Sequence, residues 1–265
     1  MKIITFANKK GGVTKTTSSI NLATGFGLLG RKVLLIDFDP QCNSTDMLIR
    51  GKTRKPTNQL SPSVFDVLAD EKGKVDITKT IRTRTREENV HLLPSSIDMD
   101  DIDVTLSKQA LWGLALNRRR KELESLDYEI VIVDTPPGSY KLKTIGLYAS
   151  DLVILPVIPS HMALDGLADA LDEIEAIEQH MSRTVNYKVL FNRVKYHGKN
   201  IQKSSEKVAT ELREIIGDRL LDSFIPEDDI MINAEKWGRS VLSYAPNSKA
   251  AYAYADLLKE VSTYV

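Results

Sequence analysis

The sequence is poor in cysteine and has no long hydrophobic run. Its 265 residues include a single cysteine, Cys42, so no disulfide can form within the chain. Because disulfides are rare in reducing compartments, this usage agrees with a cytoplasmic location. No apolar stretch reaches the length needed to cross a bilayer, and Met1 leads directly into a strand-like segment. We therefore expect no membrane partner and no signal peptide.

The chain also lacks a net charge. Lysine plus arginine and aspartate plus glutamate both number 36. A nucleic-acid-binding surface needs an excess of positive charge, so any contact with DNA would require a local basic patch. A net charge near zero does little to keep copies of the chain apart, which favours reversible self-association.

Short apolar segments alternate with amphipathic segments along the whole chain. We predict strands at Lys2–Ala7, Val33–Phe38, Val90–Leu93, Ile130–Val133, Leu152–Val157, Val189–Phe191 and Phe224–Ile225. We predict helices at Thr16–Leu29, Ser63–Ala69, Asp98–Leu126, Ala163–His180, Lys203–Ile216 and Ala250–Tyr264. This alternation predicts an α/β fold with a doubly wound, mainly parallel sheet flanked by helices. No repeat and no long linker interrupts the sequence, so we expect one domain over residues 1–265.

A glycine-containing turn follows the first predicted strand. It reads Lys9-Lys10-Gly11-Gly12-Val13-Thr14-Lys15-Thr16-Thr17 and leads into the first predicted helix. Backbone N–H groups and the helix dipole favour an anion at a helix N-terminus, so this context predicts a phosphate-binding loop. Lys15 would contact the β- and γ-phosphates of a nucleotide, and the Thr16 hydroxyl would bind Mg²⁺. The alternative is a glycine turn with solvated lysines.

A wholly apolar strand, Ile130–Val133, is followed by Asp134. Ligands of open α/β sheets bind beyond the carboxyl ends of the strands, so this order is a Walker B pattern. Asp134 would hold Mg²⁺ through a water, because Mg²⁺ gives up its hydration shell reluctantly. The alternative is an aspartate that only initiates a turn.

The second predicted strand ends in Asp37-Phe38-Asp39-Pro40-Gln41. Strand alternation puts Asp37 and Asp39 on one side and Phe38 on the other. Asp37 lies deeper in the strand, and we expect it to support the metal site or the loop. The alternative is a structural pair of aspartates that caps the turn before Pro40.

The loop departs from the standard Walker A spacing, which would place glycines at positions 9 and 14. This chain has Lys9 and Thr14 there, and it has Lys10 directly before two glycines. The Lys-Gly-Gly-x-x-Lys-Thr order resembles the deviant Walker A motif of the ParA/MinD family. The segments that end in Asp39 and Asp134 match further signatures of that family. The chain is most like the short, Soj-like ParA partition ATPases.

The resemblance implies a P-loop ATPase with ATP and Mg²⁺ as its ligands. Lys10, Lys15 and Asp39 would be catalytic, with Asp39 positioning the attacking water. Thr16, Asp39 and Asp134 would form the metal site. Asn192, in the segment Phe191-Asn192-Arg193, resembles the family's adenine-recognition element, and Pro226 would form another wall of that pocket. The nucleotide-binding residues would be Lys10, Gly11, Gly12, Val13, Thr14, Lys15, Thr16, Thr17, Asn192 and Pro226.

The resemblance also implies a cycle of association. Two chains would sandwich ATP, and Lys10 of each would reach the phosphates held by the other. Hydrolysis would then let the homodimer separate, at a slow basal rate that a ParB-like adaptor stimulates. The ATP-bound dimer would bind DNA without sequence preference and associate with the nucleoid. Candidate DNA-binding residues are Arg193, Lys195, Lys199, Lys203, Lys236 and Arg239.

Two departures from the family pattern stand out. Thr14 replaces the glycine that usually precedes the loop lysine, and it is strained if that position needs a positive φ. We expect it to be harmless. Many relatives carry arginines just after the Ile-Pro pair of the late strand, whereas this chain has the acidic Glu227-Asp228-Asp229. That part of the family's DNA-binding surface is therefore not carried over.

Three alternatives remain open from the sequence. A positioning ATPase could move a protein cargo, such as a carboxysome or a chemoreceptor cluster, instead of a plasmid or chromosome. A MinD-like division regulator would need a basic amphipathic terminal helix, whereas residues 250–265 carry a single cation, Lys259. A metabolic enzyme of the same superfamily, such as an amidoligase, would need a substrate pocket that the sequence does not identify.

Overall fold

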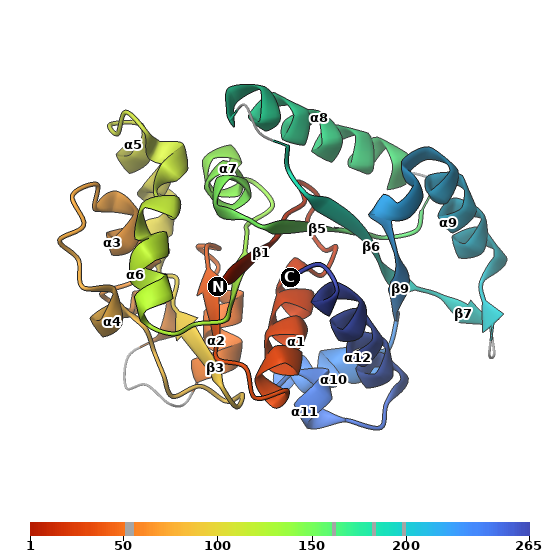
Figure 1. Cartoon of the computed structure of the whole chain (residues 1–265). Helices are drawn as coiled ribbons and strands as arrows, with labels where there is room; N and C mark the ends of the chain where they lie inside the picture. The colour runs from red at the N-terminus through yellow and green to blue at the C-terminus, as the bar shows by residue number, and fades with distance from the viewer. Residues whose placement is uncertain (51–55, 161–162, 182–183, 198–199) are drawn as a thin grey trace.

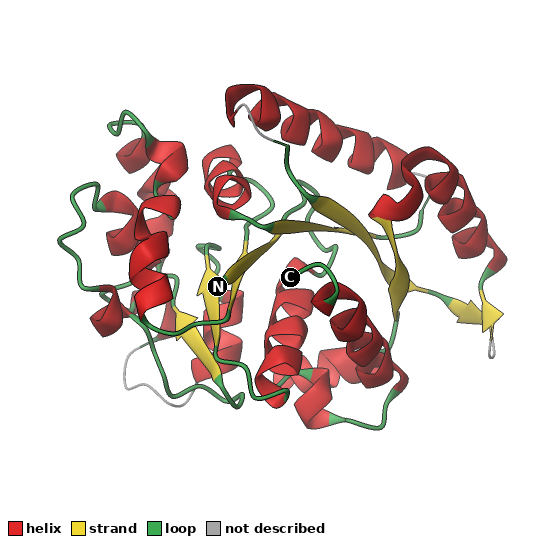
Figure 2. Cartoon of the chain, in the orientation of Figure 1, coloured by secondary structure: helices red, strands yellow, loops and turns green. Residues whose placement is uncertain are grey.

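The computed structural model describes residues 1–50, 56–160, 163–181, 184–197 and 200–265. A seven-stranded sheet runs through the middle with helices on both sides (Figures 1 and 2). Its strand order is β3-β2-β4-β1-β5-β6-β9, and all of the recorded pairings are parallel. The strands are β1 (Lys2–Phe6), β2 (Val33–Asp37), β3 (Val90–Leu93), β4 (Ile130–Asp134), β5 (Leu152–Val157), β6 (Tyr187–Val194) and β9 (Leu220–Pro226). The predicted doubly wound, mainly parallel sheet is therefore confirmed.

Apolar strands form this sheet because both of its faces are buried. In β4, Ile130 and Ile132 pack on one face, whereas Val131 and Val133 pack on the other. A sheet with one wet face would require alternating polar residues, and β4 has none before Asp134. Because the strands run in parallel, their carboxyl ends meet along one edge, and there the polar residues begin.

Two sets of helices cover the faces (Figure 1). One face packs against α1 and α12, and its core includes Ile20, Phe26 and Leu257. The other face is covered in two parts, by the segments from α3 to α7 and by α8 and α9. The helices on the first face are α1 (Lys15–Leu28), α2 (Asn43–Ile49), α10 (Asp229–Lys236), α11 (Val241–Tyr244) and α12 (Lys249–Ser262). The remaining helices are α3 (Val64–Ala69), α4 (Ile77–Thr80), α5 (Ile102–Leu106), α6 (Arg120–Ser125), α7 (Tyr140–Ala149), α8 (Ala163–Met181) and α9 (Lys203–Ile216).

The largest error of the sequence analysis is the continuous helix predicted over Asp98–Leu126. The structure has α5, α6 and three short 3₁₀ turns there. The Gln109 side chain donates instead to the carbonyl oxygens of Leu68 and Ala69 at the end of α3, both at 3.1 Å. Arg118 donates to the carbonyl oxygen of Leu111. These tertiary contacts outweigh local helix propensity, which Gly113 weakens further.

Other differences are smaller. The helix predicted from Ser63 begins at Val64, with Ser63 as its N-cap in a capping box with Asp66. Between α2 and α3 lies the 3₁₀ turn Thr57–Gln59, and residues 51–55 lie outside the described chain. Helices α2, α4, α7, α10 and α11 and the small antiparallel pair β7 (Tyr196–His197) and β8 (Asn200–Ile201) were not predicted.

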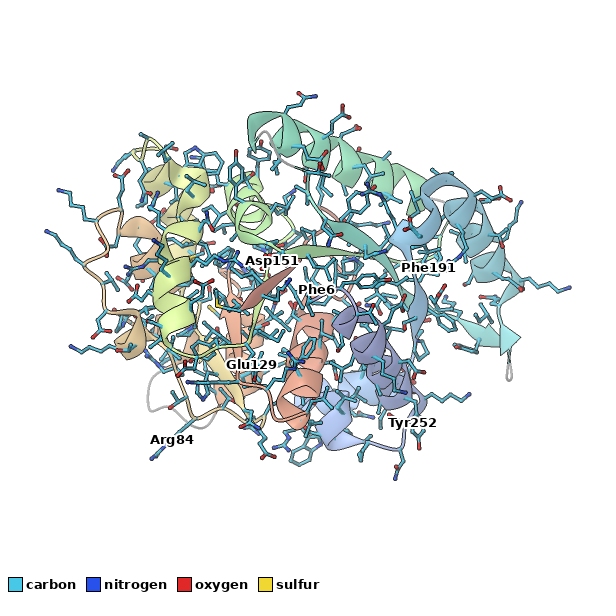
Figure 3. The ribbon with its side chains drawn as sticks, viewed as in Figure 1. Phe6, Arg84, Glu129, Asp151, Phe191 and Tyr252 are labelled. Atoms are coloured by element: carbon cyan, nitrogen blue, oxygen red, sulfur yellow. The ribbon has the colours of Figure 1, made fainter. Side chains whose placement is uncertain are left out.

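The start of β1 is held by a partly buried ion pair. Asp151, which precedes β5 and is labelled in Figure 3, accepts a hydrogen bond from the backbone N–H of Ile3 at 2.8 Å. The same carboxylate pairs with Arg120 of α6, also at 2.8 Å. The Asp151 carboxylate thus links β1, the residue before β5 and α6, which are distant in sequence.

Both edges of the sheet are partly closed. Arg82 and Leu92 exchange two backbone hydrogen bonds, of 2.7 and 2.9 Å, along the outer side of β3. The pairing of β9 with β6 shifts register between Leu220 and Phe224. There, Glu260 of α12 accepts from the N–H groups of Asp222 and Ser223, both at 2.8 Å.

Gly27 of α1 sits where no larger residue fits. A Cβ atom at this position would lie 2.3 Å from the carbonyl oxygen of Glu88. We expect Gly27→Ala to lower the free energy of unfolding by about 1–3 kcal/mol through overpacking. Urea unfolding measures the change. The control is Gly166→Ala in α8, where a Cβ meets nothing within 4 Å; there the free energy should rise by about 0.5–1 kcal/mol. A Gly27→Ala variant as stable as wild type would contradict the close approach.

Candidate nucleotide site

The phosphate loop joins the end of β1 to the start of α1. Lys15, the first residue of α1, is buried, and its Nζ donates to the carbonyl oxygens of Asn8 at 3.0 Å and Lys10 at 3.4 Å. Asn8 donates from Nδ2 to the carbonyl oxygen of Pro156 at 2.7 Å and accepts from the N–H of Lys10 at 2.8 Å. Asn8, which the sequence analysis did not single out, thus anchors the loop to β5.

Burial lowers the pKa of the Lys15 ammonium, and the nearby charges of Asp134 and Asp39 oppose this effect. An amine desolvated in this way gains most from a nearby anion, because a low-dielectric site strengthens the attraction. The carbonyl oxygens that now accept from Nζ hold the side chain over the loop. The position suits contact with a phosphate group.

Thr14 is strained. Its φ is 66° and its ψ is 34°, in the left-handed region that β-branched residues rarely adopt. It is the N-cap of α1, yet its hydroxyl bonds to the carbonyl oxygen of Val13 and does not cap the helix. The expectation that Thr14 is harmless is therefore wrong, because the backbone here has the conformation for which glycine is best suited.

The two lysines before the glycines differ in their contacts. Lys9 forms an ion pair with Asp169 of α8 at 3.6 Å. Lys10 is exposed, and in the described part of the chain no ion pair is recorded for its ammonium. The Lys10 side chain is therefore accessible to solvent in this structure.

Asp37 and Asp134 lie side by side, because β2 pairs with β4 in the register that matches these two residues. Both are fully buried. Asp37 accepts from the N–H of Asp39 at 3.0 Å, and from the N–H and hydroxyl of Thr45 at 2.8 and 2.7 Å. Asp37 is thus committed to holding the loop, which agrees with the supporting role expected for it.

Burial raises the pKa of both carboxyl groups. For Asp37, the adjacent charge of Asp134 raises the pKa further, against the hydrogen bonds from Thr45. For Asp134, the neighbouring hydroxyls of Ser44 and Thr16 lower the pKa, as does the charge of Lys15. Two buried carboxylates this close resist joint ionisation, and a bound cation would relieve their repulsion.

The donor set fits Mg²⁺. Asp134 Oδ2 accepts from the Ser44 hydroxyl at 2.7 Å, whereas its Oδ1 is buried and has no geometrically assigned hydrogen-bond partner in the described residues. The Thr16 hydroxyl is close enough to lower the pKa of Asp134. Mg²⁺ is usually held by one or two protein oxygens together with phosphates and waters. Thr16 and Asp134 Oδ1 provide such oxygens beside the phosphate loop.

Asp39 lies at the rim of the same group. Its Oδ1 accepts from the N–H of Gln41 at 2.9 Å, and 8% of the residue remains accessible. Next to it, Cys42 is buried in the left-handed N-cap position of α2. Burial raises the pKa of the Cys42 thiol to about 12, so this cysteine has no thiolate character at neutral pH.

The predicted adenine contacts lie at the ends of β6 and β9. Asn192 is fully buried; its amide donates to Ser18 of α1 at 2.9 Å and accepts from the N–H of Arg193 at 3.0 Å. The pairing of Val194 with Pro226 brings the two strand ends together. The Asn192 side chain thus joins β6 to α1, and its contact with adenine stays a prediction.

The candidate DNA-binding residues are not equivalent. Glu227, which directly follows the Ile225-Pro226 pair of β9, pairs with Arg193 at 2.5 Å and with Lys195 at 3.9 Å. Arg239 faces the buried carboxylate of Glu87 at 3.5 Å. Lys199 lies outside the described residues. Lys203 and Lys236 are exposed, and within the described ranges no ion pair is recorded for either.

Comparison with known proteins places this geometry in a family. A family model described as an AAA domain matches residues 1–187. The sporulation initiation inhibitor protein Soj of Bacillus subtilis is 30% identical over 261 residues, which cover 98% of each chain. The chromosome partitioning protein ParA of Caulobacter vibrioides is 30% identical over 265 residues, covering 98% of this chain and 94% of the relative. The chain belongs to the ParA/MinD family of P-loop proteins.

Solved structures agree with the fold. An ATP complex of McdA from Cyanothece superposes with a TM-score of 0.84 at 22% identity, covering 99% of this chain and 96% of that one. Cobyrinic acid a,c-diamide synthase from Mycobacterium smegmatis, solved with an ATP analogue and magnesium, gives a TM-score of 0.79 at 27% identity. The alignment with the synthase covers 99% of this chain and 94% of that one.

The strain at Thr14 gives a direct test. The left-handed conformation costs a residue with a Cβ atom about 1–2 kcal/mol of stability. Glycine avoids this cost, but it loses more conformational entropy on folding, which lowers stability by about 0.5–1 kcal/mol. We expect Thr14→Gly to raise the free energy of unfolding of the nucleotide-free protein by about 0.5–1 kcal/mol, measured by urea titration. Thr14→Ala, which keeps the Cβ atom, should gain less. A loss of stability in Thr14→Gly would mean that Thr14 contributes a contact that outweighs its strain.

Proposed function

We propose that this protein is a ParA-type ATPase that binds Mg²⁺-ATP and converts it to ADP and phosphate, with weak basal activity. The observation that carries the proposal is the meeting of Lys15, Thr16 and Asp134 at the carboxyl ends of β1 and β4, where no hydrogen-bond partner is assigned to Asp134 Oδ1 among the described residues. A buried lysine, a hydroxyl and an available carboxylate oxygen are what a nucleotide and its metal require. We further propose that residues 1–265 act as one domain.

Within this proposal, each side chain has a separate task. Lys15 leaves the carbonyl oxygens of Asn8 and Lys10 and donates to the terminal phosphates. The N–H groups of residues 11–17 point toward the same phosphates. Asp39, at the rim, accepts a hydrogen bond from the attacking water and orients it in line. Bound Mg²⁺ would neutralise charge on the phosphate oxygens, with Thr16 as a ligand and Asp134 holding a metal-bound water.

Lys10 supports an ATP-dependent homodimer. Its exposed ammonium lies outside the group formed by Lys15 and the carboxylates, whereas Lys9 is paired within its own chain. A second copy facing this site would bring phosphates within reach of Lys10. Binding free energy for the nucleotide then contributes to association, and loss of the terminal phosphate weakens it.

The proposed cargo is DNA, either a plasmid or a chromosome, with a ParB-like adaptor that stimulates hydrolysis. The relative of this chain in Caulobacter is named as a chromosome partitioning protein. A protein cargo remains the second candidate. An amidoligase is a third, favoured by the 27% identity to cobyrinic acid a,c-diamide synthase.

The last helix argues against a MinD-like membrane regulator. The buried residues of α12 include Tyr254, Leu257 and Val261, so its apolar face packs on the core. No helix in the described ranges is both long and apolar enough to span a bilayer.

The dimer can be tested with neighbouring lysines as a matched pair. Size exclusion with light scattering should show dimers of wild type in ATP and Mg²⁺ and monomers in ADP. Lys10→Ala should remain monomeric in both, whereas Lys9→Ala, which removes only the ion pair to Asp169, should behave as wild type. Asp39→Ala should retain the dimer with turnover abolished. Elution that is the same for every variant and nucleotide would refute the sandwich.

DNA binding by the ATP-bound dimer rests on local cations, since the net charge is zero. We expect a gel shift of nonspecific DNA at low salt only with ATP and Mg²⁺, and this complex would bring the protein to the nucleoid. Lys203→Glu or Lys236→Glu should weaken the shift and flatten its salt dependence, because fewer counterions are released. Lys108→Glu makes the same charge change away from the proposed residues and should not. No shift of wild type at low salt would remove DNA from the proposal.

A further inference from the structure

One hydroxyl beside the proposed metal site has no role among those given above. Ser44 is the second residue of α2, and its side chain is fully buried. Its Oγ donates to Asp134 Oδ2 at 2.7 Å, which joins the start of α2 to the end of β4, 90 residues away. Among the described residues, the hydrogen bond that is recorded for the Ser44 side chain is therefore the one to Asp134.

The next residue, Thr45, donates to the neighbouring carboxylate of Asp37. Thr45 donates its hydroxyl proton to Asp37 at 2.7 Å, and the same oxygen accepts from the N–H of Ser95 at 3.0 Å. A hydroxyl has one proton, so Thr45 cannot also donate to Asp134. Two consecutive residues, Ser44 and Thr45, thus donate hydrogen bonds to the two aspartates that the β2–β4 register places side by side.

As a result, the two carboxylate oxygens of Asp134 have different surroundings. Ser44 donates to Oδ2, whereas Oδ1 is buried and has no hydrogen-bond partner assigned within the described ranges. A carboxylate held at one oxygen cannot rotate freely about its terminal torsion. The hydrogen bond from Ser44 therefore restricts the plane of the carboxylate and leaves the other oxygen for another partner.

We propose that Ser44 is a positioning residue for the metal, acting through Asp134: its hydrogen bond to Oδ2 orients Oδ1 toward the metal-bound water. The inference rests on the proposed binding of Mg²⁺-ATP at this site. Groups that orient a metal-binding carboxylate commonly change metal affinity by about 10–100-fold when they are removed. Within this proposal Ser44 acts only through Asp134, so it is a positioning residue and not a catalytic one.

The test measures how much Mg²⁺ strengthens nucleotide binding. The dissociation constant of a fluorescent, non-hydrolysable ATP analogue is determined with Mg²⁺ and with EDTA, and the ratio of the two is compared between variants. Ser44→Ala should lower this ratio about tenfold while the constant in EDTA stays near that of wild type. The matched control is Ser19→Ala in α1, which removes another buried hydroxyl, one that has no hydrogen-bond partner assigned among the residues that the structure describes.

Two further variants separate positioning from a merely structural role. Asp134→Asn should lower the ratio by itself, and adding Ser44→Ala to it should cause no further loss, because Ser44 acts through that carboxylate. Ser44→Thr, which keeps the hydroxyl, should recover at least part of the ratio. Additive losses in the double variant, or an equal weakening in EDTA, would overturn the proposal in favour of general packing.

The outcome for the wild type keeps the two proposals apart. If wild type binds no nucleotide, the proposed function fails. If it binds the analogue more tightly with Mg²⁺ and Ser44→Ala keeps the full ratio, only the role of Ser44 is wrong.

Discussion

The close approach of two buried carboxyl groups is the constraint on which the site depends. The register of β2 against β4 sets Asp37 beside Asp134, and both lie away from water. Such a pair is costly unless donors satisfy it. The first turn of α2 supplies them through Ser44 and Thr45, so the site depends on where that short helix begins. The loop residue Cys42 takes a left-handed conformation to start it there.

Much of this could be predicted from the sequence, because strong local patterns coincide with the parts that bind phosphate. The apolar run before Asp134 indicated a strand buried on both faces, and the glycine turn after β1 indicated that a helix would follow. These features depend on neighbours in the chain. The family resemblance then extended the prediction to ATP and Mg²⁺, and comparison with known proteins confirmed the family.

The missed features depend on contacts distant in sequence. No local signal shows that Gln109 would bind the end of α3 and break a helix, or that Ser44 would reach Asp134. The backbone conformation of Thr14 could have been inferred from the glycine it replaces, and there the favoured alternative was wrong. Ser139 after a Pro-Pro-Gly turn was an available signal for α7, since its side chain caps that helix. The role of Glu227 became clear only once Arg193 and Lys195 were found beside it.

The partly closed sheet edges affect whether copies of the protein can aggregate by pairing their edge strands. Exposed strand edges invite other chains to add to the sheet, a route that leads to aggregates. Here the Arg82 segment covers part of β3, and Glu260 occupies two amides of β9 at its register shift. A carboxylate on an edge also repels a second negatively charged edge. Crowding many copies together should therefore leave their sheets separate, and the molecules remain free to part again.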